Sequence, residues 1–325
     1  MSGDALVSIR GLTVEAAGAS GTYHLLRGVD LEIRRGRILG IVGESGSGKS
    51  TLASAIIGLL PANVSRIAGE IRLGGLDLVG LGDERMRALR GARIAMIFQD
   101  PMTVLNPVFT VGTQLIDVVR RKTPGTSRQA ARAKAQAMLT RVGIPDARSR
   151  LAAYPHQLSG GMRQRVMIAM ALLTESELIL ADEPTTALDA TVEAQIVELF
   201  RALRQDTSRA VLFISHHLGL LAEFGDDIAV MYGGLVVETG PMAQVMARPS
   251  HPYTAALIAC EIDEAPADQP LATIPGAPPS PLTRPQGCLF APRCALAVEP
   301  CRQAPPPMIE ARPGIFSRCI RSGDV

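Results

Sequence analysis

A glycine-rich segment near the start of the chain constrains the fold more than any other part of the sequence. Residues 43–50 read GESGSGKS, which fits the pattern G-x-x-x-x-G-K-[ST]. The mostly apolar run 37–42 predicts a buried strand before it, and a helix through Leu60 is predicted after it. Glycines let backbone N–H groups approach phosphate oxygens closely, and the N-terminus of a helix favours negative charge. This strand–loop–helix order predicts a phosphate-binding loop in an α/β fold.

The residues of this loop have defined roles in binding a nucleotide. Lys49 can reach the β- and γ-phosphates, and Ser50 can ligate Mg²⁺. The alternative is a tight strand-to-helix turn that binds nothing, but the strand and helix predicted on either side favour the phosphate site. The residues predicted to bind nucleotide here are Gly43, Ser45, Gly46, Gly48, Lys49, Ser50 and Thr51.

A second apolar run, residues 178–181, ends in two adjacent carboxylates, Asp182 and Glu183. Because successive side chains of a strand point in opposite directions, the two carboxylates can take different roles. Asp182 would hold Mg²⁺ through its water shell, and Glu183 would act as the general base that polarises an attacking water. Alone, such a strand end is more often the start of a solvated loop, but the phosphate loop favours the catalytic interpretation.

The remaining pattern predicts a mixed α/β organisation. Up to about residue 95, short β-branched segments alternate with glycine-rich turns, and residues 108–173 are predicted to be mostly helical. We predict antiparallel strands at 7–9, 31–33 and 71–73, a helix at 130–142 ended by Gly143, and a strand–helix–strand unit of a parallel sheet at 178–181, 190–204 and 211–214.

Composition argues against nucleic-acid binding and against membrane-spanning segments. The formal net charge is +2 and aromatic residues are 3% of the chain, so neither a broad basic surface nor a base-stacking platform is expected. The longest apolar runs, such as 166–173, fall far short of the roughly 18 residues that span a bilayer. We therefore expect a protein that is soluble or that reaches a membrane through a partner.

A third motif connects these features to a known family. Residues 158–165, LSGGMRQR, resemble the L-S-G-G-Q signature of ABC ATPases, and the motifs follow one another in the family's order. The resemblance covers residues 5 to about 240. It implies a RecA-like P-loop NTPase core with an antiparallel β subdomain and a helical subdomain. It also implies ATP and Mg²⁺ as ligands.

In the family, each ATP is sandwiched between the phosphate loop of one subunit and the signature of another. The signature residues precede a helix that we expect to begin near Met162, so they would offer N–H groups and a helix dipole to a γ-phosphate. Without the family, this segment is only a helix start. The residues implied to act on the partner's ATP are Ser159, Gly160, Gly161 and Gln164, and Ala187, Leu188 and Asp189 resemble the D-loop.

Three more residues receive roles from the resemblance. Gln99 resembles the glutamine that senses the γ-phosphate and Mg²⁺ and links to the membrane subunits. His216 resembles the switch histidine that contacts the γ-phosphate, and His217 follows it where the family usually has Asp. Tyr23, expected in a loop, stands where the family places an aromatic ring against adenine, with simple packing as the alternative.

Three segments indicate the branch of the family. Residues 97–107, IFQDPMTVLNP, 181–190, ADEPTTALDA, and 251–254, HPYT, resemble peptide and nickel importers, although Val104 replaces the usual Ser. The resemblance implies the ATP-hydrolysing subunit of a dipeptide or oligopeptide importer. It implies as partners a second ABC ATPase subunit (more often a paralogue), two transmembrane permease subunits and an extracytoplasmic substrate-binding protein. It places the chain at the cytoplasmic face of the bacterial inner membrane.

Four of the five cysteines gather near the C-terminus. Cys288, Cys294, Cys301 and Cys319 are spaced C-x5-C-x6-C-x17-C, which fits common zinc ribbons poorly. Four thiolates suit a [4Fe–4S] cluster or tetrahedral Zn²⁺. The tail resembles the extension of peptide-importer ATPases, which is implied to hold an iron–sulfur cluster with a structural or regulatory role. Four ordinary buried thiols are the alternative.

These observations divide the chain into three parts. Residues 1–260 are expected to form the ABC ATPase domain, with its helical subdomain at about 101–173. Residues 261–287 are expected to be an extended linker, because seven prolines fall between 266 and 285. Residues 288–325 are expected to form a Cys-rich, metal-binding extension.

Other functions remain as alternatives. The same machinery can import nickel, glutathione, an opine or a sugar, because this subunit does not touch the cargo. A soluble ABC ATPase acting on DNA or ribosomes belongs to a different class, but the sequence has neither a long coiled-coil insertion nor a second ATPase unit. A drug exporter is disfavoured by the tail, by the HPYT segment and by the lack of a fused membrane domain.

Overall fold

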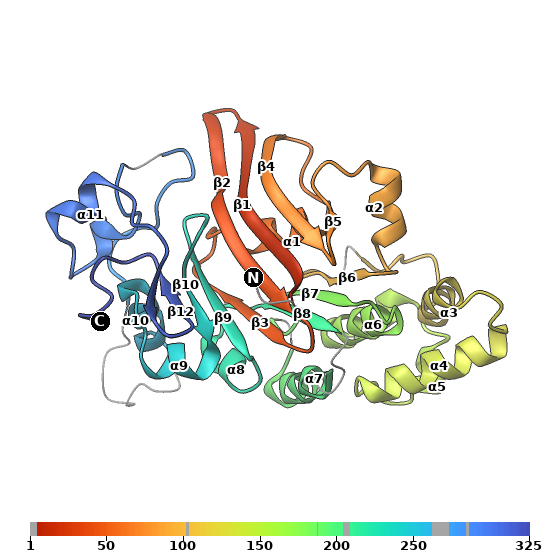
Figure 1. The fold of residues 1–325 in the computed structure, drawn as a ribbon. Helices are drawn as coiled ribbons and strands as arrows, with labels where there is room; N and C mark the ends of the chain where they lie inside the picture. The colour runs from red at the N-terminus through yellow and green to blue at the C-terminus, as the bar shows by residue number, and fades with distance from the viewer. Residues whose placement is uncertain (1–4, 102–103, 187, 204–208, 262–272, 284–285) are drawn as a thin grey trace. The chain divides into compact units, whose positions relative to one another are not determined.

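The computed structural model describes residues 5–101, 104–186, 188–203, 209–261, 273–283 and 286–325. These residues fall into two compact units (Figure 1). The first unit lies within residues 1–81 and 213–325, and the second unit within residues 82–212. Each unit combines strands with helices, so the α/β prediction is confirmed. No helix in the described part of the chain is long and apolar enough to cross a membrane.

The first unit contains a four-stranded antiparallel sheet in the order β2–β1–β4–β5. Its strands are β1 (Ala5–Gly18), β2 (Gly21–Arg34), β4 (Val64–Leu73) and β5 (Leu76–Asp77). The three predicted antiparallel strands are confirmed, because Ile9 lies opposite both Leu31 and Ile71. All three of these side chains are buried, so alternate residues of the strands supply the core.

The strand ahead of the phosphate loop belongs to a second sheet of the first unit. β3 (Ile38–Val42) pairs in parallel with β9 (Asp227–Tyr232). The sheet continues through β10 (Leu235–Pro241) and β12 (Ile315–Ser317) to β11 (Ile309–Arg312), each antiparallel to its neighbour. Every residue of β3 is buried, as predicted for a strand inside a parallel sheet, although the strand begins one residue later than predicted.

Short helices accompany the strands of the first unit. The helix predicted to run through Leu60 ends at Ile57, because Gly58 takes a left-handed conformation (φ 68°) that terminates it. The α-helices described in this unit are α1 (Lys49–Ile57), α8 (Leu218–Ala222), α9 (Met242–Ala247), α10 (Pro252–Ala259) and α11 (Glu299–Gln303).

The C-terminal residues share the sheet of the first unit. β12 lies beside β10 (Figure 1), with Ser317 opposite Glu238. In the proline-rich stretch, residues 273–283 form no helix or strand, but residues 281–283 contact β2. The His24 N–H donates to the Pro281 carbonyl over 2.8 Å, and the Arg27 guanidinium donates to the Thr283 carbonyl over 2.7 Å. This part of the stretch is therefore packed, whereas residues 262–272 and 284–285 of the predicted linker lie outside the described residues.

The second unit combines the acidic strand with a group of helices. β6 (Ile94–Ile97) pairs in parallel with β7 (Leu178–Asp182), and β8 (Ala210–Ile214) begins where the Ala210 N–H donates to the Glu177 carbonyl over 2.7 Å. Helices α3, α4 and α6 pack against one another (Figure 1). The helices described here are α2 (Asp83–Leu89), α3 (Val111–Lys122), α4 (Arg128–Arg141), α5 (Ala147–Arg150), α6 (Gly160–Leu173) and α7 (Ala190–Leu203).

Two helix predictions in the second unit are confirmed with small shifts. The helix predicted at 130–142 begins at Arg128, because the Ser127 hydroxyl accepts a hydrogen bond from the Ala130 N–H over 3.2 Å and caps it. Gly143, with φ 73°, follows its end. The helix predicted at 190–204 is described as far as Leu203. Residues 102, 103 and 187 of the family-like segments lie outside the described residues.

Helix α10 is capped from inside the core by His251. The His251 Nδ1 accepts from the backbone N–H of Tyr253 over 3.1 Å, and the backbone N–H of His251 donates to the Glu238 carboxylate over 3.0 Å. The side chain is only 2% exposed. This burial lowers the pKa of His251 from 6.5 to about 3, so the folded chain keeps the imidazole neutral.

Replacing His251 changes how stability depends on pH. Between pH 6.5 and about 3 the unfolded chain binds a proton at His251 that the folded chain does not, so stability is lost as pH falls, at a rate approaching about 1.4 kcal/mol per pH unit. His251→Asn keeps an acceptor for the Tyr253 N–H but removes this proton. Urea titrations from pH 7 to 5 should show a shallower loss of the free energy of unfolding than in wild type. The exposed His156→Asn is the control, and equal slopes in wild type and His251→Asn would contradict the expectation.

Candidate functional site

The phosphate loop connects β3 to α1 in a path that requires glycine. Gly43, Gly46 and Gly48 all have positive φ, at 148°, 78° and 101°. A Cβ atom on Gly43 would lie 2.1 Å from the Met231 carbonyl oxygen, and one on Gly48 would lie 2.9 Å from the Leu25 carbonyl oxygen. The loop therefore passes too close to neighbouring backbone for a side chain at positions 43 and 48. Ser45, Gly46 and Ser50 are exposed, so the loop and the first turn of α1 are open to a ligand.

Lys49 is the first residue of α1 and points back into the loop. Its side chain is 6% exposed, and its ammonium group donates to the Gly43 carbonyl over 2.6 Å and to the Glu44 carbonyl over 3.0 Å. The N-terminus of α1 carries no acidic side chain in its first turn. A helix N-terminus and a buried ammonium group on one tight loop fit the phosphates of a nucleotide.

His216 and Tyr23 also belong to the first unit. The Ser215 N–H donates to the Ile41 carbonyl over 3.1 Å, so the chain leaves β8 beside the end of β3 and exposes His216 at that end. Tyr23 lies in β2 opposite Ala16, and not in a loop as predicted. Its ring packs over Gly18, where a Cβ atom would come within 2.0 Å of it.

In the second unit, the structure brings Gln99 and Glu183 together. The Gln99 carboxamide donates to the Glu183 carboxylate over 3.0 Å, just beyond the ends of the paired strands β6 and β7. Asp182 is the last residue of β7 and is 6% exposed. Glu183 takes a left-handed conformation (φ 47°), which costs roughly 1–3 kcal/mol in a residue with a side chain. Because the backbone turns at Glu183, the carboxylates of Asp182 and Glu183 can point in different directions, as their different predicted roles require.

The signature residues lie at the N-terminus of α6 in the second unit. Ser159 caps the helix, because its hydroxyl accepts from the Met162 N–H over 3.3 Å. The helix begins at Gly160 rather than near Met162 as predicted, so Gly160 and Gly161 form its first turn. Ser159 and Gly160 are exposed, and a Cβ atom on Gly160 would meet nothing within 4 Å. This helix end is therefore open to an anion.

Two residues predicted with the signature have contacts inside the chain. Gln164 is 1% exposed, and its carboxamide donates to the Pro184 carbonyl over 2.8 Å. The side chain is therefore occupied beside the turn that carries Glu183, and the role of Gln164 on a partner's ATP stays a prediction. The Asp189 carboxylate accepts from the Val192 N–H over 3.0 Å, which makes it the cap of α7.

The four C-terminal cysteines line one small, narrow cavity in the first unit, together with His251 and Phe290. The Cys288 N–H donates to the Cys301 carbonyl over 2.7 Å, and the Arg321 N–H donates to the Cys319 sulfur over 3.3 Å. Among the described residues, no group of three or more His, Cys, Asp or Glu side chains is placed to hold a metal ion. The structure thus gathers the predicted ligands around a common space without arranging them as a metal site.

Burial favours the protonated form of three thiols that line this cavity, those of Cys288, Cys294 and Cys319. It raises the pKa of Cys288 and Cys294, and it raises the pKa of Cys319 to about 11. Neighbouring cysteine charges add to the effect in each case. Binding a cation here would have to offset the cost of forming thiolates in a buried space.

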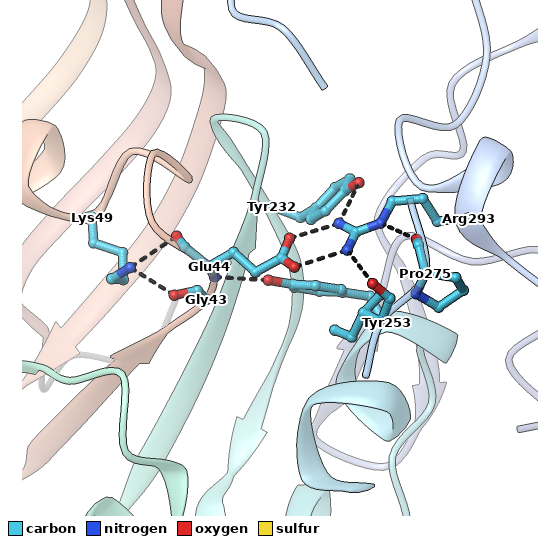
Figure 2. A network of polar contacts seen from close by, with 8 residues as sticks. Gly43, Glu44, Lys49, Tyr232, Tyr253, Pro275 and Arg293 are labelled. Carbon is cyan, nitrogen blue, oxygen red and sulfur yellow. Dashed lines mark hydrogen bonds and ion pairs between the residues drawn. The ribbon is translucent and has the colours of Figure 1, made fainter. Parts of the chain in front are cut away.

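Sequence reasoning missed a group of contacts at the second residue of the loop, Glu44 (Figure 2). Its carboxylate forms a two-point ion pair with Arg293, and its N–H donates to the Tyr253 hydroxyl over 2.8 Å. Arg293 and Tyr253 lie more than 200 residues from the loop, so no local spacing relates them to it. The HPYT segment, which contains Tyr253, and Arg293 before Cys294 were the available signals in the sequence. Neither of them indicates that the contact partner is Glu44.

Family comparisons match two parts of the chain. The family described as ABC transporter matches residues 26–186, and the family described as oligopeptide/dipeptide transporter, C-terminal region, matches residues 237–301. The first match contains the phosphate loop, the signature and the acidic pair, and the second contains the HPYT segment and three of the four clustered cysteines.

Individual relatives agree with these matches. A Brucella melitensis protein provisionally named a peptide import ATP-binding protein is 44% identical over 335 residues, which cover 99% of this chain and 98% of the relative. The dipeptide transport ATP-binding protein DppD of Escherichia coli is 44% identical over 315 residues, covering 97% and 96%. A solved dimeric ATP-binding cassette bound to ADP and Pi in a post-hydrolysis state has a TM-score of 0.66 at 28% identity, covering 73% of this chain and 98% of that one.

The phosphate loop, the acidic turn and the exposed signature helix thus occur in a chain that aligns over nearly its whole length with these transport proteins. The chain therefore belongs to the family of ABC transporter ATP-binding proteins, in the branch with the oligopeptide/dipeptide transporter C-terminal region.

Proposed function

We propose that this chain is the ATP-hydrolysing subunit that powers import of dipeptides or oligopeptides across the bacterial inner membrane. The observation that carries the proposal is the phosphate loop, in which Lys49 is buried at the N-terminus of α1 between two loop carbonyls. The names of both relatives support the cargo, because they refer to peptides or dipeptides, and the name of the Brucella melitensis relative supports the direction, because it refers to import.

The loop and the acidic turn supply the groups that hydrolysis requires. In the proposal, the loop amides and Lys49 bind the phosphates, and Ser50 and Asp182 hold Mg²⁺. Glu183 accepts a proton from the attacking water, and the hydrogen bond from Gln99 orients its carboxylate. His216 contacts the γ-phosphate from its exposed position two residues after the end of β8, and Tyr23 offers its ring to adenine from β2.

The exposed signature helix supports a head-to-tail pair of ATPase subunits. Ser159, Gly160 and Gly161 present N–H groups and the positive end of α6, and they would bind the γ-phosphate of the partner's ATP. A solved relative of this fold is dimeric. The second ATPase subunit is proposed to be a paralogue, and closing and reopening of the pair would drive two permease subunits that receive cargo from an extracytoplasmic binding protein. The chain would then sit at the cytoplasmic face of the membrane through the permeases.

The cysteine cavity is proposed to hold a metal centre, a [4Fe–4S] cluster in preference to Zn²⁺. The four thiols line one cavity and suit either centre, which would stabilise their thiolate forms. The preference for iron rests on the resemblance of the tail to that of peptide importers. The role of the centre would be structural or regulatory, because hydrolysis is assigned to other residues.

Metal content tests this part of the proposal. Anaerobically purified chain should contain iron and show the broad visible absorbance of a cluster, and a variant with all four cysteines changed to serine should lose both. Cys260→Ser is the matched control and should retain the metal, because Cys260 lies outside the cavity. Stoichiometric zinc without iron would assign the site to Zn²⁺ and not to an iron–sulfur cluster. A metal-free wild-type chain would contradict the proposal of a metal centre.

Glu183→Gln tests the general base. The variant should bind ATP with unchanged affinity but release phosphate at least about 100-fold more slowly, because the amide cannot accept the proton of the attacking water. Single-turnover phosphate release measures the effect. Glu198→Gln, an exposed glutamate on α7, is the control and should hydrolyse ATP as the wild type does. Normal turnover by Glu183→Gln would refute the assignment.

Cargo-dependent turnover tests the transport function. The chain is reconstituted in proteoliposomes with the proposed permease, ATPase and binding-protein partners, and phosphate release is measured with a panel of cargos. Di- and oligopeptides should raise turnover and enter the vesicles. Stimulation only by nickel, glutathione, an opine or a sugar would keep the mechanism and change the cargo. Stimulation only by DNA or ribosomes would refute transport.

A further inference from the structure

Glu44, the second residue of the phosphate loop, is held at three separate groups: its carbonyl, its backbone N–H and its carboxylate (Figure 2). Its carbonyl accepts from the Lys49 ammonium over 3.0 Å, and its N–H donates to the Tyr253 hydroxyl over 2.8 Å. Its carboxylate receives two hydrogen bonds from Arg293, Nη1 to Oε2 over 2.7 Å and Nη2 to Oε1 over 2.9 Å. Two of the three attachments come from the C-terminal part of the chain, outside the loop and its helix.

The Arg293 side chain is also held by contacts outside the loop. Its Nε donates to the Pro275 carbonyl over 2.8 Å, Nη2 donates to the Ile274 carbonyl over 3.1 Å, and Nη1 lies 3.3 Å from the Tyr232 hydroxyl. The side chain is 4% exposed. A planar guanidinium with these partners has one orientation, and a two-point pair with a carboxylate is the strongest contact that it makes.

The charge of Glu44 explains why such a contact matters. The loop binds an anion, and a carboxylate within the loop repels phosphate unless a cation neutralises it. Glu44 is 26% exposed, so water screens its carboxylate only in part. Arg293 supplies the opposite charge and fixes the carboxylate at a defined place.

We propose that Arg293 is a positioning residue of the ATP site, which acts through Glu44 to hold the phosphate loop in its binding conformation and to neutralise its one acidic side chain. The inference rests on the proposed role of this loop as the ATP site. It gives the C-terminal segment that carries the clustered cysteines a direct part in nucleotide affinity, since Arg293 immediately precedes Cys294.

Nucleotide binding by the full-length chain tests the proposal. Titration calorimetry with the non-hydrolysable Mg²⁺·AMP-PNP gives the Kd of wild type, Arg293→Ala and Arg318→Ala. Arg293→Ala should raise the Kd about tenfold, the loss of about one charge-assisted contact. Arg318 is the matched control, because it anchors the C-terminal segment to the Val236 carbonyl and to Asp30 without contact to the loop. Its Kd should stay within about twofold of wild type.

A double-mutant cycle separates positioning from general stability. In a Glu44→Gln background no carboxylate remains for Arg293 to hold, so adding Arg293→Ala should change the Kd less than about twofold. A thermal melt is recorded for every variant. If Arg293→Ala does not fold, Arg293→Lys replaces it; it keeps the charge but loses the two-point geometry, and it should raise the Kd by a smaller factor, about threefold.

Several results would overturn the proposal. They are an unchanged Kd in Arg293→Ala, an equal loss in Arg318→Ala, and the same factor for Arg293→Ala with and without Glu44. A wild-type chain that binds no nucleotide would overturn the proposed ATP site together with the positioning role of Arg293. Wild-type binding with an unchanged Kd in Arg293→Ala would overturn the positioning role alone.

Discussion

The phosphate loop depends on one constraint: its backbone must turn tightly between a buried strand and a helix while its second residue stays fixed. Glycines at both ends of the loop meet neighbouring carbonyls at distances that admit no side chain. Lys49 draws two loop carbonyls together, and Tyr253 and Arg293 hold Glu44 from the other side. A loop with this many fixed points is preorganised for an anion, because little conformational entropy remains to be lost on binding.

The C-terminal part of the chain is structurally continuous with this loop. β12 extends the sheet that contains β3, through β10 and β9, and α10 begins at the buried His251 cap. Tyr253 therefore reaches the loop from a helix whose start is fixed in the core. The strands of segment 288–325 and Arg293 belong to the first unit, together with the phosphate loop. The proposed metal centre would lie in the same segment as the arginine that contacts Glu44.

Local features of the sequence predicted much of the fold and of the site. The glycine spacing of residues 43–50, the buried strand before them and the apolar run ending in Asp182 each encode their structure within a few residues. What escaped prediction depends on distant contacts. The burial of Gln164, the ring of Tyr23 over Gly18, and the pair between Glu44 and Arg293 are set by tertiary packing. The start of α6 was missed because glycine is a poor helix former, and here the Ser159 cap outweighs that preference.

Amide hydrogen exchange at residues 43–50 tests most directly whether the C-terminal part fixes this loop for ATP. In wild type the Glu44 amide should exchange slowly, because Tyr253 accepts its hydrogen, and MgATP should further protect the amides that follow. In Tyr253→Phe the Glu44 amide should exchange faster, while amides in the middle of β3 keep their rates. Rapid exchange of the Glu44 amide in wild type, or no protection of the loop by MgATP, would contradict the account.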